Sequence, residues 1–143
     1  MEMRKNILNL MSKVRSRAFL FLEKEMADAG VADLSPSHGD VLFAAARNPR
    51  CDMRQLAVLT GRDKSTLTPL VERLVRDGFL LRQISAHDRR RAEISLTPKS
   101  EKLRPKLMKI GLKLERRMLE GVSEGDREKV VAAFGRMYHN LQS

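Results

Sequence analysis

The chain has 143 residues, with 28 Lys and Arg against 18 Asp and Glu, which gives a formal net charge of +10. This length fits one domain of ordinary size and argues against a two-domain enzyme. Hydrophobic residues make up 42% of the chain and aromatic residues 4%, so we expect a modest aliphatic core and exclude disorder throughout. With no apolar run near the roughly 20 residues of a membrane span and no signal-peptide pattern, we expect a soluble cytoplasmic protein without a membrane partner.

The cysteine and histidine content argues against metal or disulfide chemistry. Cys51 is the single cysteine, and the three histidines are scattered without metal-ligand spacing, so we expect no disulfide, structural metal or cofactor. Cys51 precedes Asp52 at an expected helix start, where the helix dipole lowers the thiol pKa and the carboxylate raises it. We interpret Cys51 as a structural or surface cysteine rather than a redox sensor.

Two helices are expected in the N-terminal third of the chain. Apolar residues recur every three or four positions over residues 6–29, which predicts an amphipathic helix that ends at Gly30. Ser35 followed by Pro36 is an N-cap signature and predicts a second helix, which runs toward Asn48.

The next two segments predict a helix-turn-helix. Asp52 can cap a helix over residues 53–59, and Asp63 can start another that closes at Asp77-Gly78. Ala57 stands where the two helices must cross closely, and Gly61 stands where the turn requires a positive φ. Leu67 and Leu70 stand where the second helix must be anchored to the first.

After Gly78 the periodicity changes to that of strands. Residues 79–84 form a short apolar run, and apolar and polar residues alternate over residues 92–96, which predicts a two-stranded hairpin. The connection over residues 85–91 carries no large apolar side chain, so we expect it to project into solvent.

Two helices are expected after the hairpin. Thr97-Pro98 predicts the start of a long helix, and Pro105 inside it predicts a kink or a delayed start. Ser123 predicts the cap of a last helix.

One sequence pattern resembles a catalytic motif. The letters of residues 121–125 fit a Gly-x-Ser-x-Gly nucleophile elbow, but the segment before them is charged and helical, whereas an elbow follows a buried strand. We therefore predict that the protein is not an enzyme.

The excess of basic residues is concentrated in residues 61–91 and 97–119, which favours a polyanionic partner. Short hydroxyl and long cationic side chains on the second helix of the helix-turn-helix suit base edges and phosphates. They are Lys64, Ser65, Thr66, Thr68 and Arg73. Arg89 and Arg90 at the hairpin tip suit a narrow minor groove, with Asp88 as the hydrogen-bonded partner that orients Arg90.

The run DKSTLTPLVERLVRDGFL from Asp63, followed by HDRRR from His87 and ISLTP from Ile94, resembles the multiple-antibiotic-resistance regulator (MarR) family. The resemblance implies a mainly α winged helix-turn-helix fold in one domain over residues 1–143. Residues 35–97 would form the DNA-binding part, and residues 1–30 and 98–143 the helical dimerisation part. Ser100 stands where the family usually has the glycine of its Leu-Thr-x-x-Gly motif.

The function implied by the resemblance is that of a transcriptional repressor. Such a protein binds a pseudo-palindromic double-stranded operator as a homodimer, and many members release DNA when a small, often phenolic, ligand binds. By position, the recognition helix also includes Pro69, and the expected DNA-binding set is completed by Ser37, Arg54 and Arg62.

A small aromatic or anionic effector is expected in a cleft between the first helix, the helix over residues 35–47 and the helix after Thr97. His38 is the candidate polar contact for such an effector. Two alternatives remain open: a winged-helix module that binds RNA or a protein assembly, and contact of the basic helix over residues 99–117 with a membrane surface.

Overall fold

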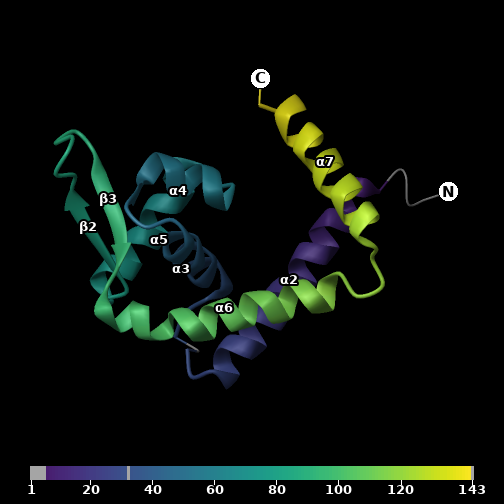
Figure 1. The fold of residues 1–143 in the computed structure, drawn as a ribbon, viewed down its shortest axis with the longest axis horizontal. Helices are drawn as coiled ribbons and strands as arrows, with labels where there is room; N and C mark the ends of the chain where they lie inside the picture. Colours follow the sequence, from purple (N-terminus) through teal and green to yellow (C-terminus); the bar gives the residue numbers. More distant parts are fainter. Residues whose placement is uncertain (1–5, 32, 143) are drawn as a thin grey trace.

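Six helices and three strands make up the part of the chain that the computed structural model describes, residues 6–31 and 33–142. The elements are α2 (Ile7–Asp28), α3 (Pro36–Arg47), β1 (Cys51–Asp52), α4 (Met53–Thr60), α5 (Lys64–Arg76), β2 (Leu80–Ile84), β3 (Ala92–Leu96), α6 (Pro98–Met118) and α7 (Glu124–Asn140). Figure 1 shows the β2–β3 hairpin at one end of the molecule, α6 along one side and α7 at the other end. The predicted fold class, mainly helical with a small hairpin, is confirmed. Residues 1–5 and 143 of the expected dimerisation part lie outside the described residues.

The helices begin at the capping residues that the sequence marks. The side chain of Asp52 accepts from the backbone N–H of Gln55, and the Gln55 side chain accepts from that of Asp52, which completes a capping box at α4. At the starts of α3, α5, α6 and α7, the side chain of the N-cap residue accepts from the backbone N–H three residues on, without the reciprocal bond; these residues are Ser35, Asp63, Thr97 and Ser123. Each such cap contributes about 1 kcal/mol to helix stability.

Helix α6 starts at Pro98 and runs through Pro105 without interruption. The predicted delayed start is therefore wrong. Pro98 occupies the first helical turn, where no N–H partner is needed, and the Thr97 side chain caps the backbone N–H of Ser100 at 3.2 Å. These two features fix the helix start upstream of Pro105.

The sheet has three strands in the order β1–β3–β2, all antiparallel. Cys51 of β1 pairs with Ile94 of β3, and Leu80 of β2 pairs with Leu96. The sequence predicted only β2 and β3, because a two-residue strand is too short to show a period of two. Cys51 lies in β1 directly before Asp52, the N-cap of α4, as expected, and its burial raises the pKa of its thiol.

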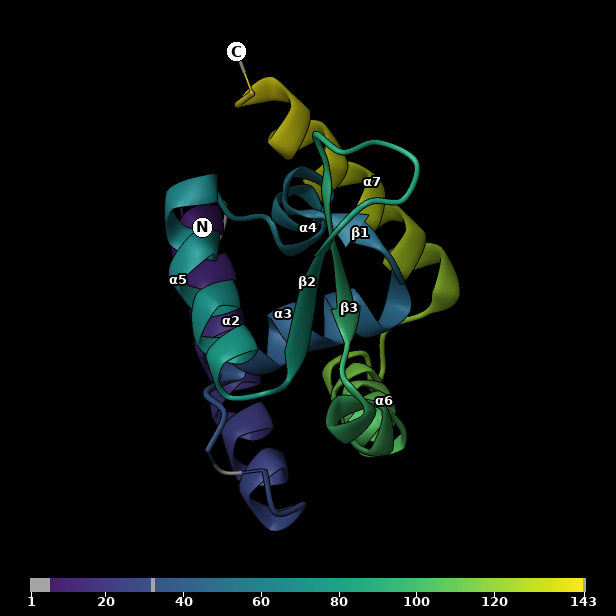
Figure 2. The same ribbon diagram turned by 90° about the vertical axis from the view of Figure 1, so that its left-hand side faces the viewer.

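The core lies where α3, α4 and α5 meet the sheet. Its fully buried large side chains include Leu42 of α3, Leu56 of α4, Leu67 of α5 and Ile94 of β3. Figure 2 shows α5 and the hairpin side by side with α3 passing behind the hairpin and α6 below. This core holds α5 and the hairpin in a fixed relation to each other.

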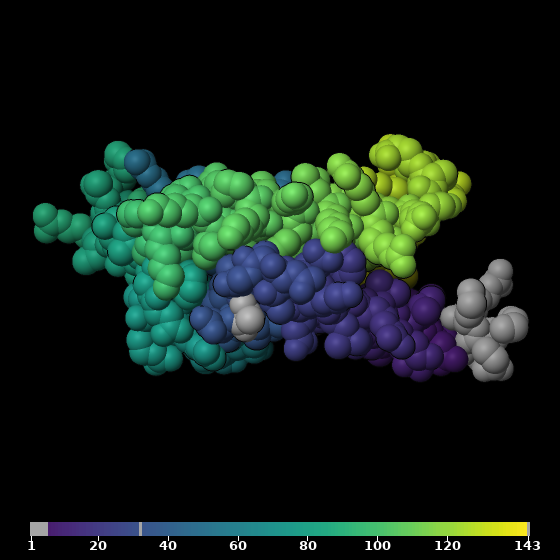
Figure 3. All heavy atoms as spheres, turned by 90° about the horizontal axis from the view of Figure 1, so that it is seen from below, coloured from purple at the N-terminus to yellow at the C-terminus, as the bar shows by residue number. Residues whose placement is uncertain are grey.

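Helices α2 and α6 cross along one face of the molecule, which Figure 3 shows from below. Met26 of α2 and Leu107 and Ile110 of α6 join the core there. In the described chain, none of the α7 side chains is buried. None of the helices in this part of the chain has both the length and the apolar composition of a membrane span.

Candidate nucleic-acid interface

The turn between α4 and α5 has the geometry that the helix-turn-helix spacing requires. Gly61 adopts φ +63°, a left-handed conformation that disfavours side chains with a Cβ, and caps the end of α4. Leu67 is fully buried, and Ala57 and Leu70 pack partly buried against the same core. The three residues and the glycine therefore occupy the roles that their positions indicate.

The first turns of α5 present polar side chains to solvent. Lys64, Ser65, Thr66 and Pro69 are exposed and Thr68 is half-buried. Asp63 organises this end: it accepts from the Thr66 backbone N–H and from Ser65 Oγ, each at 2.8 Å. Hydrogen bonds from the side chain and backbone of Thr66 are the main cause that lowers the pKa of Asp63, and the bond from Ser65 adds to it. The hydroxyl of Thr68 donates to the Lys64 carbonyl at 2.7 Å.

Further along α5, the guanidinium of Arg73 lies on the exposed surface. Its side chain is 51% exposed, and its Nε lies 3.5 Å from the carboxylate of Asp77. Such an exposed pair is weak and leaves Arg73 available to another anion. The first turns of α5 and Arg73 thus supply hydroxyls and cations from one helix.

The hairpin tip carries an ordered arginine. Asp88 Oδ1 accepts from the backbone N–H of Arg90 at 3.0 Å and from its Nε at 3.2 Å, while the Arg90 side chain is 91% exposed. The hydrogen bonds from Arg90 hold the pKa of Asp88 below its ordinary value. Ser85 Oγ supports the loop by accepting from the N–H groups of His87 and Asp88. Arg89 is exposed beside this pair.

A cleft of about 730 Å³ next to the start of α4 gathers four arginines, which are Arg47, Arg50, Arg54 and Arg91. Of these, only Arg54 was expected from the sequence. Arg91 pairs with Asp52 at 2.6 Å, and Arg50 adopts φ +62°, which is uncommon for a residue with a side chain. The spacing of Arg47, Arg50 and Arg54 was a signal for this cluster, but only the β1–β3 pairing brings Arg91 to it.

Three expected site residues are less exposed than this set. The Arg62 side chain is only 7% exposed and its Nη1 donates to Asp40 Oδ2 at 2.5 Å. Ser37 and His38 are half-buried in the first turn of α3, and His38 Nδ1 shares a 2.6 Å hydrogen bond with Ser35 Oγ. Burial, followed by the charge of Arg73, lowers the pKa of His38.

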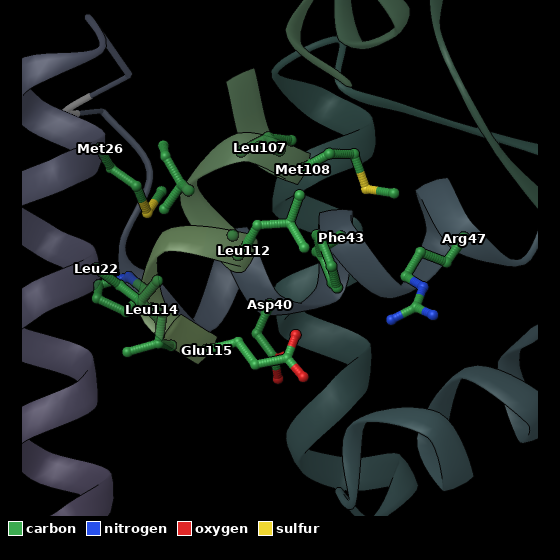
Figure 4. A pocket seen from close by; sticks show the side chains of 14 residues that line it. Leu22, Met26, Asp40, Phe43, Arg47, Leu107, Met108, Leu112, Leu114 and Glu115 are labelled. Atoms are coloured by element: carbon green, nitrogen blue, oxygen red, sulfur yellow. The ribbon is translucent and has the colours of Figure 1, made fainter. Parts of the chain in front are cut away.

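A pocket of about 440 Å³ lies between α2, α3 and α6, the three helices between which the effector cleft is expected. Its wall is mostly apolar, with Met26, Phe43 and Leu107 among its side chains (Figure 4). The charged lining residues are Asp40, Arg47 and Glu115, and His38 does not line it. Its volume falls within the range of about 300–1,000 Å³ that small-molecule sites occupy.

The chain is similar to known transcriptional regulators in sequence and in fold. Residues 32–91 match the model of the MarR family. The HTH-type transcriptional regulator BilQ of Clostridium symbiosum (strain WAL-14163) is 27% identical over 113 residues, which cover 78% of this chain and 75% of that protein.

Solved structures agree with this relationship. The transcriptional regulator PA3341 is 26% identical with a TM-score of 0.80, over 95% of this chain and 98% of that one. The transcriptional regulator SlyA, 20% identical, has the same fold with a TM-score of 0.76, over 95% of this chain and 94% of that one. The helix-turn-helix, the wing and these similarities lead to one conclusion: residues 32–91 match the MarR family, and the chain as a whole has the winged helix-turn-helix fold of solved MarR-family transcriptional regulators.

Proposed function

We propose that this protein is a repressor that binds a pseudo-palindromic double-stranded operator as a homodimer. Helix α5 enters the major groove, and the hairpin tip enters the adjacent minor groove. The observation that carries this proposal is that one core supports two exposed features. These are the hydroxyl-rich first turns of α5 and the Arg90 side chain that Asp88 orients. Hydroxyl and arginine side chains in these places read base edges and a narrow groove.

Two of the cleft arginines, Arg50 and Arg54, extend the proposed contact along the phosphate backbone. Arg54 stands in the first turn of α4 with its side chain exposed, and Arg50 lines the same cleft. Arg62 is buried in an ion pair, so we assign it a positioning role instead of a phosphate contact.

The homodimer is supported by apolar surface on the terminal helices. Exposed large hydrophobic residues on α2 include Ile7, Leu8, Leu10, Met11, Val14 and Leu20, and those on α7 include Val130, Val131, Phe134 and Tyr138. Exposed apolar surface of this extent marks a protein–protein interface. Phe134→Glu should convert a dimer to a monomer in analytical ultracentrifugation, whereas Lys102→Glu, at an exposed position of α6, should leave the dimer intact. A wild-type chain that stays monomeric at micromolar concentration would refute the dimer.

A small aromatic effector in the α2–α3–α6 pocket is the remaining part of the proposal. Bordetella bronchiseptica BpsR, whose structure is 20% identical with a TM-score of 0.74, is a relative in which 6-hydroxynicotinic acid regulates DNA binding. In this chain the pocket touches α6, which connects the winged part to the terminal helices. A ligand there can shift DNA binding only if it has different affinities for the two dimer conformations.

Fluorescence anisotropy tests the class of partner. Wild-type protein should bind one duplex sequence at least about 10³-fold tighter than random duplex, the lower end of the range for specific regulators. The same sequence as single-stranded or double-stranded RNA should compete only weakly. Equal binding of the RNA would favour the alternative of an RNA-binding module.

A further inference from the structure

One carboxylate belongs both to the pocket and to the turn that precedes α5. Asp40 of α3 lines the pocket, and its Oδ2 accepts from Arg62 Nη1 at 2.5 Å. The Asp40 side chain is 41% exposed, whereas that of Arg62 is 7% exposed. A molecule in the pocket can therefore reach the Asp40 carboxylate, while Arg62 behind it stays shielded from solvent.

Arg62 ties this carboxylate to the base of the recognition helix. Its backbone N–H donates to the Ala57 carbonyl at 3.0 Å, and its Nη1 also lies 3.3 Å from the Thr60 carbonyl. The next residue, Asp63, caps α5. If Arg62 loses Asp40, a buried guanidinium keeps only a carbonyl partner, an arrangement that strongly disfavours the present turn. The position of α5 therefore depends on whether Asp40 is paired with Arg62.

The polar groups of the pocket select the kind of ligand that can break this pair. Figure 4 shows the carboxylates of Asp40 and Glu115 at the same end of the pocket and the Arg47 guanidinium away from them. Ionised carboxylates only accept hydrogen bonds, and Glu115 is already paired with Arg127 of α7, so a ligand that binds at Asp40 must donate. An anionic ligand would instead be held by Arg47, whose guanidinium lies 5.6 Å from the centre of the Phe43 ring, and would leave Asp40 with Arg62.

We propose that the pocket takes a cationic amine with an apolar, ring-sized body, and that its ammonium group displaces Arg62 from Asp40 and so weakens operator binding. This inference rests on the proposed function, because it names the ligand class and the coupling residues of the same effector pocket. The coupling is reciprocal: bound operator must weaken amine binding by the same factor.

The test compares two probes of nearly equal shape and opposite charge, 1-naphthylmethylamine and 1-naphthoic acid. Isothermal titration calorimetry measures their binding to the dimer without DNA, and fluorescence anisotropy measures operator affinity with each probe present. The amine should bind and lower operator affinity about tenfold, a typical coupling between two sites. The acid should leave operator affinity unchanged. The proposal is overturned if the amine does not bind, or if the acid lowers operator affinity as much as the amine does.

Variants of Arg62 separate coupling from ligand binding. In Arg62→Gln the amine no longer competes with a guanidinium for Asp40, so it should bind at least as tightly as to wild type, yet operator affinity should no longer respond to it. Arg62→Lys keeps a cation and should keep part of the response. Glu115→Gln, the matched control, should weaken amine binding while saturating amine still releases the operator.

Two further outcomes are informative. An unchanged amine response in Arg62→Gln contradicts the relay through Asp40, even if the amine binds. A wild-type protein that prefers no duplex sequence in the absence of any ligand refutes the proposed function instead, because amine binding in calorimetry does not depend on DNA.

Discussion

Asp88 fixes the direction of Arg90 at the tip of the β2–β3 hairpin. Oδ1 of Asp88 accepts both the backbone N–H of Arg90, at 3.0 Å, and its Nε, at 3.2 Å. The rest of the Arg90 side chain is free in solvent, with 91% of its surface exposed. A single carboxylate thus orients an otherwise mobile guanidinium before DNA arrives, which reduces the entropy lost on binding.

Arg90→Ala should weaken operator binding and reduce the slope of log affinity against log salt by about one unit, because one phosphate or groove cation is removed. Asp88→Asn should also weaken binding, but with the slope unchanged, since Arg90 keeps its charge and loses only its orientation. Anisotropy titrations at several salt concentrations measure both. Equal affinity and slope for wild type and Arg90→Ala would show that the tip is a solvated turn.

Thr66→Ala should blur sequence preference instead of lowering all affinities together. Its exposed hydroxyl stands in the first turn of α5, where a side chain reaches base edges. Competition by single-base variants of the operator should show a loss of about 1–3 kcal/mol of discrimination at one position per half-site. Lys64→Ala is the contrasting variant, expected to weaken binding to every duplex alike. A uniform loss for Thr66→Ala would assign this hydroxyl to the backbone.

Gly61→Ala should destabilise the fold by about 1 kcal/mol, because an L residue is disfavoured at φ +63°. A Cβ at this position would meet no heavy atom within 4 Å, so the cost is conformational and not steric. Gly125→Ala is a suitable control, since a Cβ there also meets nothing and the backbone of Gly125 lies in helix α7. Urea denaturation of both variants measures the difference, and equal stability would contradict the strained turn.

Ser100→Ala should lower the free energy of unfolding by about 1 kcal/mol, the usual contribution of a buried hydrogen bond. Ser100 is fully buried, and its Oγ donates to the Phe79 carbonyl at 2.5 Å. This bond joins the start of α6 to the residue before β2. Exposed Ser12 on α2 provides the control Ser12→Ala, which should be neutral in the same thermal unfolding experiment. A neutral Ser100→Ala would mean that the Thr97 cap alone holds this junction.

Stability should fall as the pH drops below about 6.5 because of His38. Its pKa is lowered in the folded protein, mainly by burial and then by the charge of Arg73, from the usual 6.5. The unfolded chain therefore binds the proton first, and protonation favours unfolding from that pH downward. Urea midpoints at pH 7.5 and 5.5 should differ less in His38→Gln than in wild type. His139→Gln is the matched control, and an identical pH dependence in wild type and His38→Gln would contradict this assignment.

Local signals in the sequence were sufficient for most of the fold. Capping residues such as Asp63 and Thr97 mark their helix starts because the side-chain bond is made within three residues. Gly61 marks the turn because its need for positive φ is a property of one residue. The fold class followed from such signals, and the family from the resemblance carried by the runs that start at Asp63, His87 and Ile94.

Long-range contacts explain what the sequence could not show. β1 exists only because Cys51 meets Ile94 across the sheet, and its two residues have no periodicity of their own. Arg62 looks like a DNA-facing cation beside α5, yet it is buried because Asp40, 22 positions earlier, supplies its counter-charge. The charged lining of the pocket likewise comes from α3 and α6, which are distant in sequence.

Selection of bound sequences from a random duplex library tests the central claim most directly. A dimer that places one α5 per half-site should enrich two inverted half-sites whose centres lie about 10 bp, one helical turn, apart. Footprinting on the enriched duplex should show protection over both halves. Enrichment of a single unrepeated site, or no enrichment over the starting library, would contradict a dimeric, sequence-specific regulator.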